Sequence, residues 1–159
     1  MAIELGDRAP NFTLFDSQAK AVQLSDFLGQ WVLLYFYPRD NTPGCTQEAQ
    51  GFRDLKTEYD QLQTVIIGVS GDDAKSHQKF IHKHDLPFLL LTDPDTAVAT
   101  AYGSYGPKKF MGKTYEGIYR HSFLINPEGA MAKIYRKVKP ADHAAQVLVD
   151  LASLQAPNS

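Results

Sequence analysis

Runs of apolar residues along the chain predict the strands of a buried sheet. Residues 31–37 (WVLLYFY) are apolar or aromatic throughout, which is typical of a strand covered on both faces. The runs at 65–69 and 88–91 predict two further strands. Apolar residues recur at helical spacing between 52 and 62, and a second helix is predicted over 73–84. This β-α-β-α order predicts a parallel core with right-handed crossovers.

The two ends of the chain predict antiparallel additions to this core. Alternating residues at 11–14 and 21–24 predict an N-terminal hairpin. Strands at 120–125 and 130–135 are joined by Asn126-Pro127-Glu128-Gly129, which fits a type I turn with proline second and glycine fourth.

Three further segments complete the predicted organisation. A short helix is expected from Pro94 to about Tyr102, and residues 103–117, rich in Gly, Pro, Lys and Tyr, are predicted to form a long surface loop. A last helix from about Ala141 is expected to bury Ala145, Leu148, Val149 and Leu151, and residues 156–159 are expected to fray. The length of 159 residues predicts one domain, 1–159.

A polar loop, Pro38 to Cys45, joins the first buried strand to the following helix and carries the only cysteine. Thr42 is a good N-cap and Pro43 suits the first helical position, so Cys45 is predicted in the first turn. Unpaired backbone N–H groups and the helix dipole favour an anion there, and a thiolate is such an anion. The thiolate is the nucleophilic form of cysteine, so this loop is the candidate active site.

Composition and charge exclude several functional classes. Hydrophobic residues make up 43% and charged residues 21%, as in an ordinary globular protein. A net charge of −2 provides no field for nucleic acid or an anionic membrane. A lone cysteine excludes a disulfide scaffold and fits a reducing compartment. The sequence shows no secretory leader and no apolar run of membrane-spanning length, so a cytoplasmic location is expected.

The loop also carries a resemblance to a known family. Pro38, Thr42 and Cys45 form a Pro-x-x-x-Thr-x-x-Cys pattern that is similar to the active-site signature of the peroxiredoxins. The surrounding residues 37–40 and 42–49 resemble the bacterioferritin-comigratory-protein subgroup, also called peroxiredoxin Q. The resemblance extends from residues 6–12 through 117–125 to the last helix. It implies a thioredoxin-like α/β fold, with a mixed central sheet, helices on both faces and an N-terminal hairpin.

The resemblance implies a thiol peroxidase that reduces hydrogen peroxide and organic hydroperoxides in antioxidant defence, without metal, haem or flavin. Cys45 would attack a peroxide oxygen and become a sulfenic acid. Arg120 would lie beside the sulfur and hold the peroxide oxygens, and Thr42 would accept a hydrogen bond from the peroxide, besides capping the helix. Pro38 would shield the thiolate from water, and Glu48 would orient Arg120.

One position departs from the subgroup pattern. Many members carry a second cysteine five residues after the first, where this chain has Gln50. No internal disulfide can form, so an external thiol must resolve the sulfenic acid, and thioredoxin, glutaredoxin or glutathione are the candidate reductants. The subgroup resemblance favours a monomer, with a weak edge-on dimer as the alternative.

Other readings of the chain are weaker. A disulfide oxidoreductase would need a Cys-x-x-Cys pair, and Thr42 stands in place of its first cysteine. A non-enzymatic redox sensor would use the oxidised thiol as a signal, and peroxide turnover with excess thiol distinguishes it from an enzyme.

Three histidines, His77, His82 and His84, are interpreted as a solvated helix face and not as a zinc site. The lysines Lys108, Lys109 and Lys113 are interpreted as solvated cations, and His121 is assigned no role.

Overall fold

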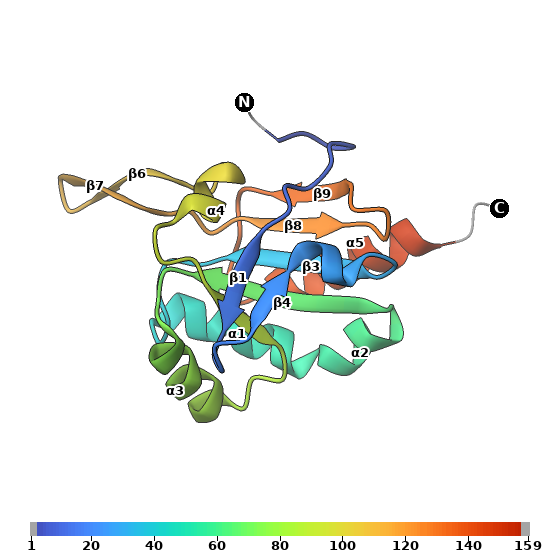
Figure 1. The fold of residues 1–159 in the computed structure, drawn as a ribbon, viewed down its shortest axis with the longest axis horizontal. Helices are drawn as coiled ribbons and strands as arrows, with labels where there is room; N and C mark the ends of the chain where they lie inside the picture. Colours follow the sequence, from blue (N-terminus) through green and yellow to red (C-terminus); the bar gives the residue numbers. More distant parts are fainter. Residues whose placement is uncertain (1–2, 157–159) are drawn as a thin grey trace.

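A seven-stranded mixed sheet forms the centre of the molecule in the computed structural model, which describes residues 3–156 (Figure 1). The frayed C-terminal end predicted above involves residues 157–159, which lie outside this range. The strand order is β2-β1-β5-β4-β3-β8-β9. The strands are β1 (Thr13–Asp16), β2 (Ala21–Gln23), β3 (Trp31–Phe36), β4 (Thr64–Ser70), β5 (Leu89–Thr92), β8 (Ser122–Ile125) and β9 (Met131–Tyr135).

The central strands β3, β4 and β5 are parallel, and the outer strands are antiparallel to their neighbours. The predicted parallel core and both predicted hairpins, β1–β2 and β8–β9, are therefore confirmed. In the turn between β8 and β9 the backbone N–H of Gly129 donates to the carbonyl oxygen of Asn126 at 2.9 Å.

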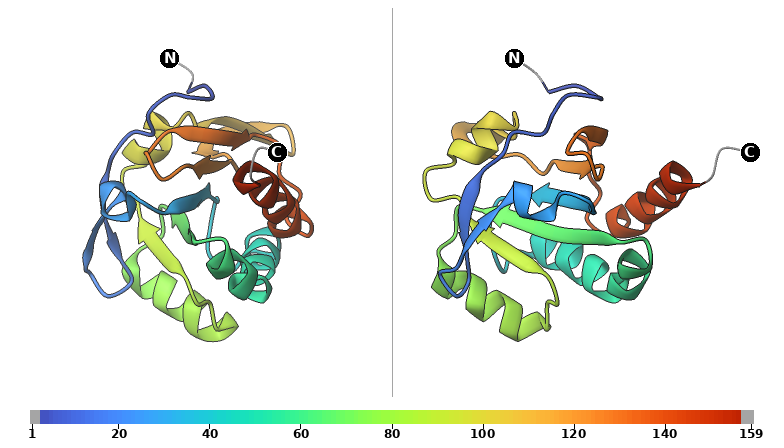
Figure 2. Two further views of the ribbon diagram at one scale, coloured as in Figure 1. Left: turned by 90° about the vertical axis from the view of Figure 1, so that its right-hand side faces the viewer. Right: turned by 45° about the vertical axis from the view of Figure 1, so that its right-hand side comes forward.

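Helices cover the two faces of the sheet unequally (Figure 2). One face carries four helices: α1 (Pro43–Asp54), α2 (Lys56–Gln61), α3 (Ala74–His84) and α5 (His143–Gln155). The other face carries α4 (Ala97–Ala101), a 3₁₀ turn (Leu24–Phe27) and the N-terminal segment. Strand β3 shows why both sides need covering: Leu33 and Tyr35 pack into the four-helix side, and Leu34 and Phe36 pack into the other.

The helical pattern predicted between residues 52 and 62 belongs to two helices. The backbone leaves helical geometry at Leu55, with φ −106° and ψ 12°, so α1 ends at Asp54 and α2 begins at Lys56. Phe52 and Tyr59 are fully buried on the same side of the sheet.

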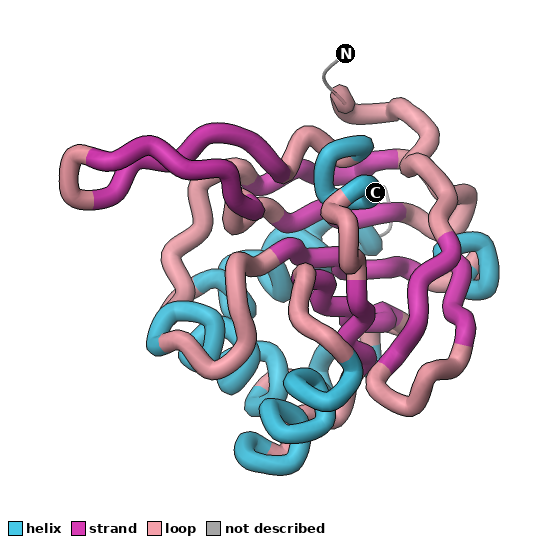
Figure 3. The backbone as a smooth tube through the Cα atoms, turned by 60° about the vertical axis from the view of Figure 1, so that its left-hand side comes forward, coloured by secondary structure: helices cyan, strands magenta, loops and turns pink. Residues whose placement is uncertain are grey.

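The surface loop predicted over residues 103–117 is wrong, because this segment forms a β-hairpin of β6 (Tyr105–Phe110) and β7 (Lys113–Ile118). The hairpin projects from the body of the molecule (Figure 3). Most of its side chains are exposed on both faces, so its sequence lacks the alternation that marks a half-buried strand. Its turn residues Met111 and Gly112 have φ values of 53° and 80°, as a tight hairpin turn requires.

The predicted buried face of the last helix is right only in part. Leu151 is buried and Leu148 is partly buried against the core, as predicted, whereas Ala145 is exposed and Val149 is 70% exposed. Ala144 and Val147, which were not predicted, are buried. Two neighbouring stripes of this helix are apolar, so periodicity in the sequence does not identify the stripe that packs against α1.

Candidate active site

Cys45 lies where the sequence predicts it, in the first turn of α1 beyond the carboxyl end of β3. Thr42 is the N-cap, with φ −89° and ψ 156°, and Pro43 is the first helical residue. The Thr46 N–H donates to the Thr42 carbonyl oxygen at 2.8 Å and closes the turn around the cysteine. Cys45 is only 2% exposed, so its sulfur, at the N-terminus of the helix, has little access to bulk water.

Arg120 reaches this sulfur from the segment that connects β7 to β8, two residues before β8 begins. Its Nη2 donates to Cys45 Sγ at 3.4 Å. Gly44 makes this approach possible, because a Cβ atom at that position would lie 3.0 Å from Arg120 Nη2. The structure therefore brings together the two side chains that the sequence analysis named as nucleophile and cationic partner.

Glu48 lies one helical turn after Cys45 and contacts the same guanidinium. Arg120 Nη1 donates to Glu48 Oε1 at 2.8 Å, which confirms the predicted contact. The carboxylate is 1% exposed, and burial raises the pKa of Glu48 to about 7 although Arg120 acts in the opposite direction. Burial would lower the pKa of Arg120, but the charges of Cys45 and Glu48 outweigh it and raise that pKa. Arg120 is therefore a permanent cation between the Cys45 sulfur and the Glu48 carboxyl group.

Thr42 and Pro38 occupy the loop in front of the cysteine. The Thr42 hydroxyl donates to the Arg39 carbonyl oxygen at 3.0 Å, so its proton is engaged and its oxygen is left as an acceptor. Pro38 is half-buried, one residue after Tyr37, where the chain leaves the sheet.

A buried polar network that the sequence analysis missed fastens this loop to α3. Asp40 accepts from the Tyr37 hydroxyl at 2.6 Å and from the Ser76 hydroxyl at 2.8 Å, and His77 Nδ1 lies 2.7 Å from its carboxylate. His77 Nε2 lies 3.2 Å from the carbonyl oxygen of Leu91, so each ring nitrogen has a polar partner. The loop between β3 and α1 is therefore tied to a helix far from it in sequence.

The interpretation of His77 as part of a solvated helix face is wrong, because its side chain is fully buried. Helical spacing alone did not identify the buried partner, which is Asp40 in a loop 37 residues earlier. Asp40 lies just after β3 and His77 lies in the first turn of α3, with two helices and a strand between them, so no local pattern indicated the contact.

Lys108, on the projecting hairpin, also departs from its predicted solvated state. It is half-buried, and its Nζ donates to the carbonyl oxygen of Ile118 at 3.0 Å. Burial and the charge of Arg120 lower the pKa of Lys108, while Cys45 acts in the opposite direction. The base of the hairpin thus adds a second cation on the Arg120 side of the site.

Gln50, at the position of the missing second cysteine, faces α3. Its Nε2 lies 3.3 Å from His84 Nδ1, and Arg53 Nη1 donates to the His84 carbonyl oxygen at 2.9 Å. These contacts hold the middle of α1 against the end of α3.

No metal centre accompanies these side chains in the part of the chain that the structure describes, since no three His, Cys, Asp or Glu residues gather there in a way that could hold an ion. None of the helices formed by residues 3–156 is long and apolar enough to cross a membrane.

Comparison with known proteins agrees with the family resemblance of the sequence. The AhpC/TSA family matches residues 5–134. The chain is 49% identical to the putative peroxiredoxin Bcp of Haemophilus influenzae, over 96% of this chain and 98% of the relative, and 48% identical to peroxiredoxin Bcp of Bacillus subtilis, over 95% and 96%. A solved structure of Xanthomonas campestris bacterioferritin comigratory protein, from work on its alkyl peroxide reduction activity, superposes with a TM-score of 0.88 at 38% identity, covering 96% of this chain and 97% of the other.

Proposed function

Since the chain belongs to the AhpC/TSA family and is a peroxiredoxin, a thiol peroxidase of the Bcp group, we propose that Cys45 is its peroxidatic nucleophile. The observation that carries this proposal is the contact between Cys45 Sγ and Arg120 Nη2, at 3.4 Å, in the first turn of α1. A cation and a helix N-terminus both stabilise a thiolate, and only the thiolate attacks the peroxide bond.

In the proposed first step the Cys45 sulfur forms a bond to one peroxide oxygen while the O–O bond breaks. The sulfur is oxidised to a sulfenic acid, and the departing oxygen takes up a proton and leaves as water or an alcohol. Negative charge moves from sulfur onto the departing oxygen, so donors must lie along that path. Arg120 presents its fork of N–H donors there, together with the unpaired backbone N–H groups of the first turn of α1.

Thr42 and Pro38 complete the proposed site. The Thr42 oxygen, whose proton is engaged by Arg39, accepts a hydrogen bond from the peroxide O–H and orients the peroxide for attack. Pro38 limits the access of water to the thiolate. Glu48 acts through Arg120 as a positioning residue, since it holds one side of the guanidinium at 2.8 Å and leaves the other for sulfur and peroxide.

The sulfenic acid is resolved by a thiol from outside the chain, because Cys45 is the only cysteine. The external thiol displaces water to form a mixed disulfide, and a second thiol releases Cys45. Glutathione with glutaredoxin, or thioredoxin by direct attack, are the reductants we propose. Substrates are hydrogen peroxide and alkyl hydroperoxides, the latter in line with the activity named for the Xanthomonas campestris relative.

We also propose a cytoplasmic location and a monomeric enzyme. A lone catalytic cysteine that depends on external thiols fits a reducing compartment.

The test is the rate at which one equivalent of hydrogen peroxide consumes the Cys45 thiol at neutral pH, in the folded protein and in urea. Full ionisation of an ordinary cysteine, a few per cent thiolate at pH 7, increases the rate only about thirtyfold, or roughly 2 kcal/mol. We expect the folded rate to exceed the unfolded rate by far more than this factor. A ratio within the thirtyfold bound would contradict a peroxidase site and favour a redox sensor. The Cys45→Ser variant provides the baseline for both states.

A further inference from the structure

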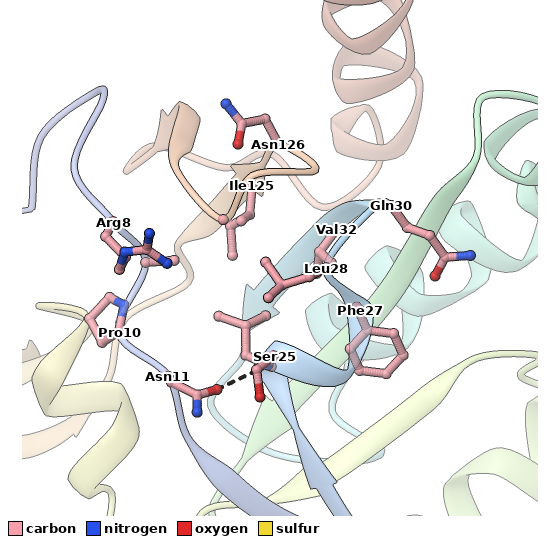
Figure 4. Close-up of a pocket in the computed structure, with 13 residues that line it drawn as sticks. Arg8, Pro10, Asn11, Ser25, Phe27, Leu28, Gln30, Val32, Ile125 and Asn126 are labelled. Atoms are coloured by element: carbon pink, nitrogen blue, oxygen red, sulfur yellow. Dashed lines mark hydrogen bonds between the residues drawn. The ribbon is translucent and has the colours of Figure 1, made fainter.

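A hollow lies at the end of β3 opposite to the loop that carries Cys45. It has a volume of about 370 Å³ and is bordered by Val32 near the start of β3, the 3₁₀ turn and the end of β8 (Figure 4). Small-molecule sites in proteins have volumes of roughly 300–1,000 Å³, so this hollow can hold a small ligand. Because Cys45 follows the opposite end of the same strand, the peroxidase reaction does not use it.

The floor of the hollow is apolar. Leu24, Val32 and Ile125 line it and are buried in the core. Phe27 and Leu28 form its wall, and the Leu28 side chain is 56% exposed. Burial of this exposed hydrocarbon by an apolar ligand would be favourable.

Two asparagine side chains at the rim of the hollow offer hydrogen-bond donors. The Asn11 Oδ1 atom accepts from the Ser25 N–H at 3.0 Å, and the Asn126 Oδ1 atom accepts from the N–H groups of Glu128 at 3.1 Å and Ala130 at 2.9 Å (Figure 4 draws the first of these bonds). Their amide oxygens are therefore occupied, and their N–H₂ groups remain as donors.

Arg8 supplies the only formal charge of the lining. Its guanidinium makes no hydrogen bond or ion pair within residues 3–156, and no Asp or Glu lines the hollow. Asp7, its neighbour in sequence, accepts instead from the backbone N–H of Glu4 at 2.9 Å. One unpaired cation and two amide donors above an apolar floor match a ligand with one anionic head and an apolar body.

We propose that this hollow binds a small monocarboxylate with an aliphatic or aryl body. Its carboxylate pairs with the Arg8 guanidinium, which suits the two-point geometry of a carboxylate, and its body packs on Leu24, Val32 and Ile125. Binding here is independent of Cys45 and leaves the catalytic thiol free to react.

The test is a titration of the reduced full-length protein with octanoate, followed by ¹H–¹⁵N NMR, beside the same titration with neutral octanamide. We expect shifts confined to residues 8–11, 24–32 and 125–129, with octanoate binding more tightly than octanamide. Arg8→Gln should weaken octanoate binding about tenfold or more, the factor of one charge-assisted hydrogen bond, and should leave octanamide binding unchanged. Arg136→Gln, which removes an exposed arginine outside the hollow, is the matched control and should not alter either titration.

Several results would overturn the proposal. Equal binding of octanoate and octanamide, insensitive to Arg8→Gln, would leave only a non-selective apolar crevice. Shifts centred on residues 38–46 would place the acid at the catalytic thiol. Binding of a peptide through its C-terminal carboxylate, without binding of octanoate, would assign the hollow to a protein partner.

Discussion

Replacement of Glu48 by glutamine tests whether the fold holds this carboxylate at an energetic cost. Glu48 is 1% exposed, and burial raises its pKa from 4.5 to about 7 even though Arg120 opposes the change. Its Oε2 atom has no hydrogen-bond partner among residues 3–156. Glutamine has nearly the same shape, and its amide oxygen can still accept from Arg120. The substitution therefore removes the negative charge and changes little else.

The sign and size of the effect follow from the two pKa values. Between pH 4.5 and 7 the folded protein keeps a proton on Glu48 that the unfolded chain has lost. The stability contributed by this proton is complete below pH 4.5 and is lost as the pH rises through 7, so the free energy of unfolding falls across this window. The interval from 4.5 to about 7, at about 1.4 kcal/mol per pKa unit, corresponds to about 3 kcal/mol.

The assay is urea unfolding of the reduced wild type and Glu48→Gln between pH 4 and pH 8. We expect the free energy of unfolding of the glutamine variant, relative to wild type, to rise by about 3 kcal/mol from the acidic to the alkaline end. Glu58→Gln makes the same chemical change at an exposed position of α2, and its curve should run parallel to that of the wild type. Parallel curves for Glu48→Gln as well would refute the reasoning, because the ion pair with Arg120 would then compensate burial completely.

Four further predictions concern the loop from Pro38 to Cys45 and the side chains that contact it. Arg120→Ala should lower the rate of peroxide reduction about a hundredfold, also at a pH where both thiols are ionised, because transition-state donors are lost; stopped-flow rates that converge at high pH would limit Arg120 to thiolate stabilisation. Thr42→Val should lower the rate about tenfold or more by loss of a hydrogen-bond acceptor, and Thr42→Ser should restore it; equal rates for the two variants would exclude that role. His77→Gln should destabilise the protein by about 3 kcal/mol in urea, because it removes a fully buried side chain that contacts the buried Asp40 carboxyl group at 2.7 Å, whereas His82→Gln on the exposed side of α3 should have little effect; equal stabilities would contradict this. Without thiols, excess peroxide should convert Cys45 to sulfenic and then sulfinic acid, and a disulfide-linked dimer as the main product in mass spectrometry would contradict this outcome.

The sequence predicted the central strands and the position of Cys45 in the first turn of a helix because their signals are local. Seven apolar residues at 31–37 indicate a strand covered on both faces, and Thr42 followed by Pro43 indicates a helix start. The contact of Arg120 with Cys45 joins residues 75 positions apart, and only the family resemblance pointed to it.

The failures share a physical cause, since each depends on contacts that periodicity does not encode. The β6–β7 hairpin is exposed on both faces, so the backbone pairing that forms it leaves no apolar alternation. The buried state of His77 depends on Asp40, in a loop that precedes α1. The buried stripe of α5 depends on where α1 lies, and Ala144 is buried because it faces Gly51 of that helix, where a Cβ atom would lie 3.4 Å from the Ala144 Cβ.

The burial of Cys45 gives the two halves of the proposed cycle different steric demands. Cys45 is 2% exposed, and we expect a molecule of peroxide size to reach its sulfur with less movement of the chain than a protein thiol needs. A mixed disulfide requires a second sulfur at about 2 Å and a second backbone within roughly 6 Å. Because Cys45 is only 2% exposed, we expect reduction by a protein thiol to require local unwinding of the first turn of α1, and oxidation not to require it. Greater rigidity at the start of α1 would then preserve the speed of oxidation, slow the return of the thiol and lengthen the time in which a second peroxide can inactivate the enzyme.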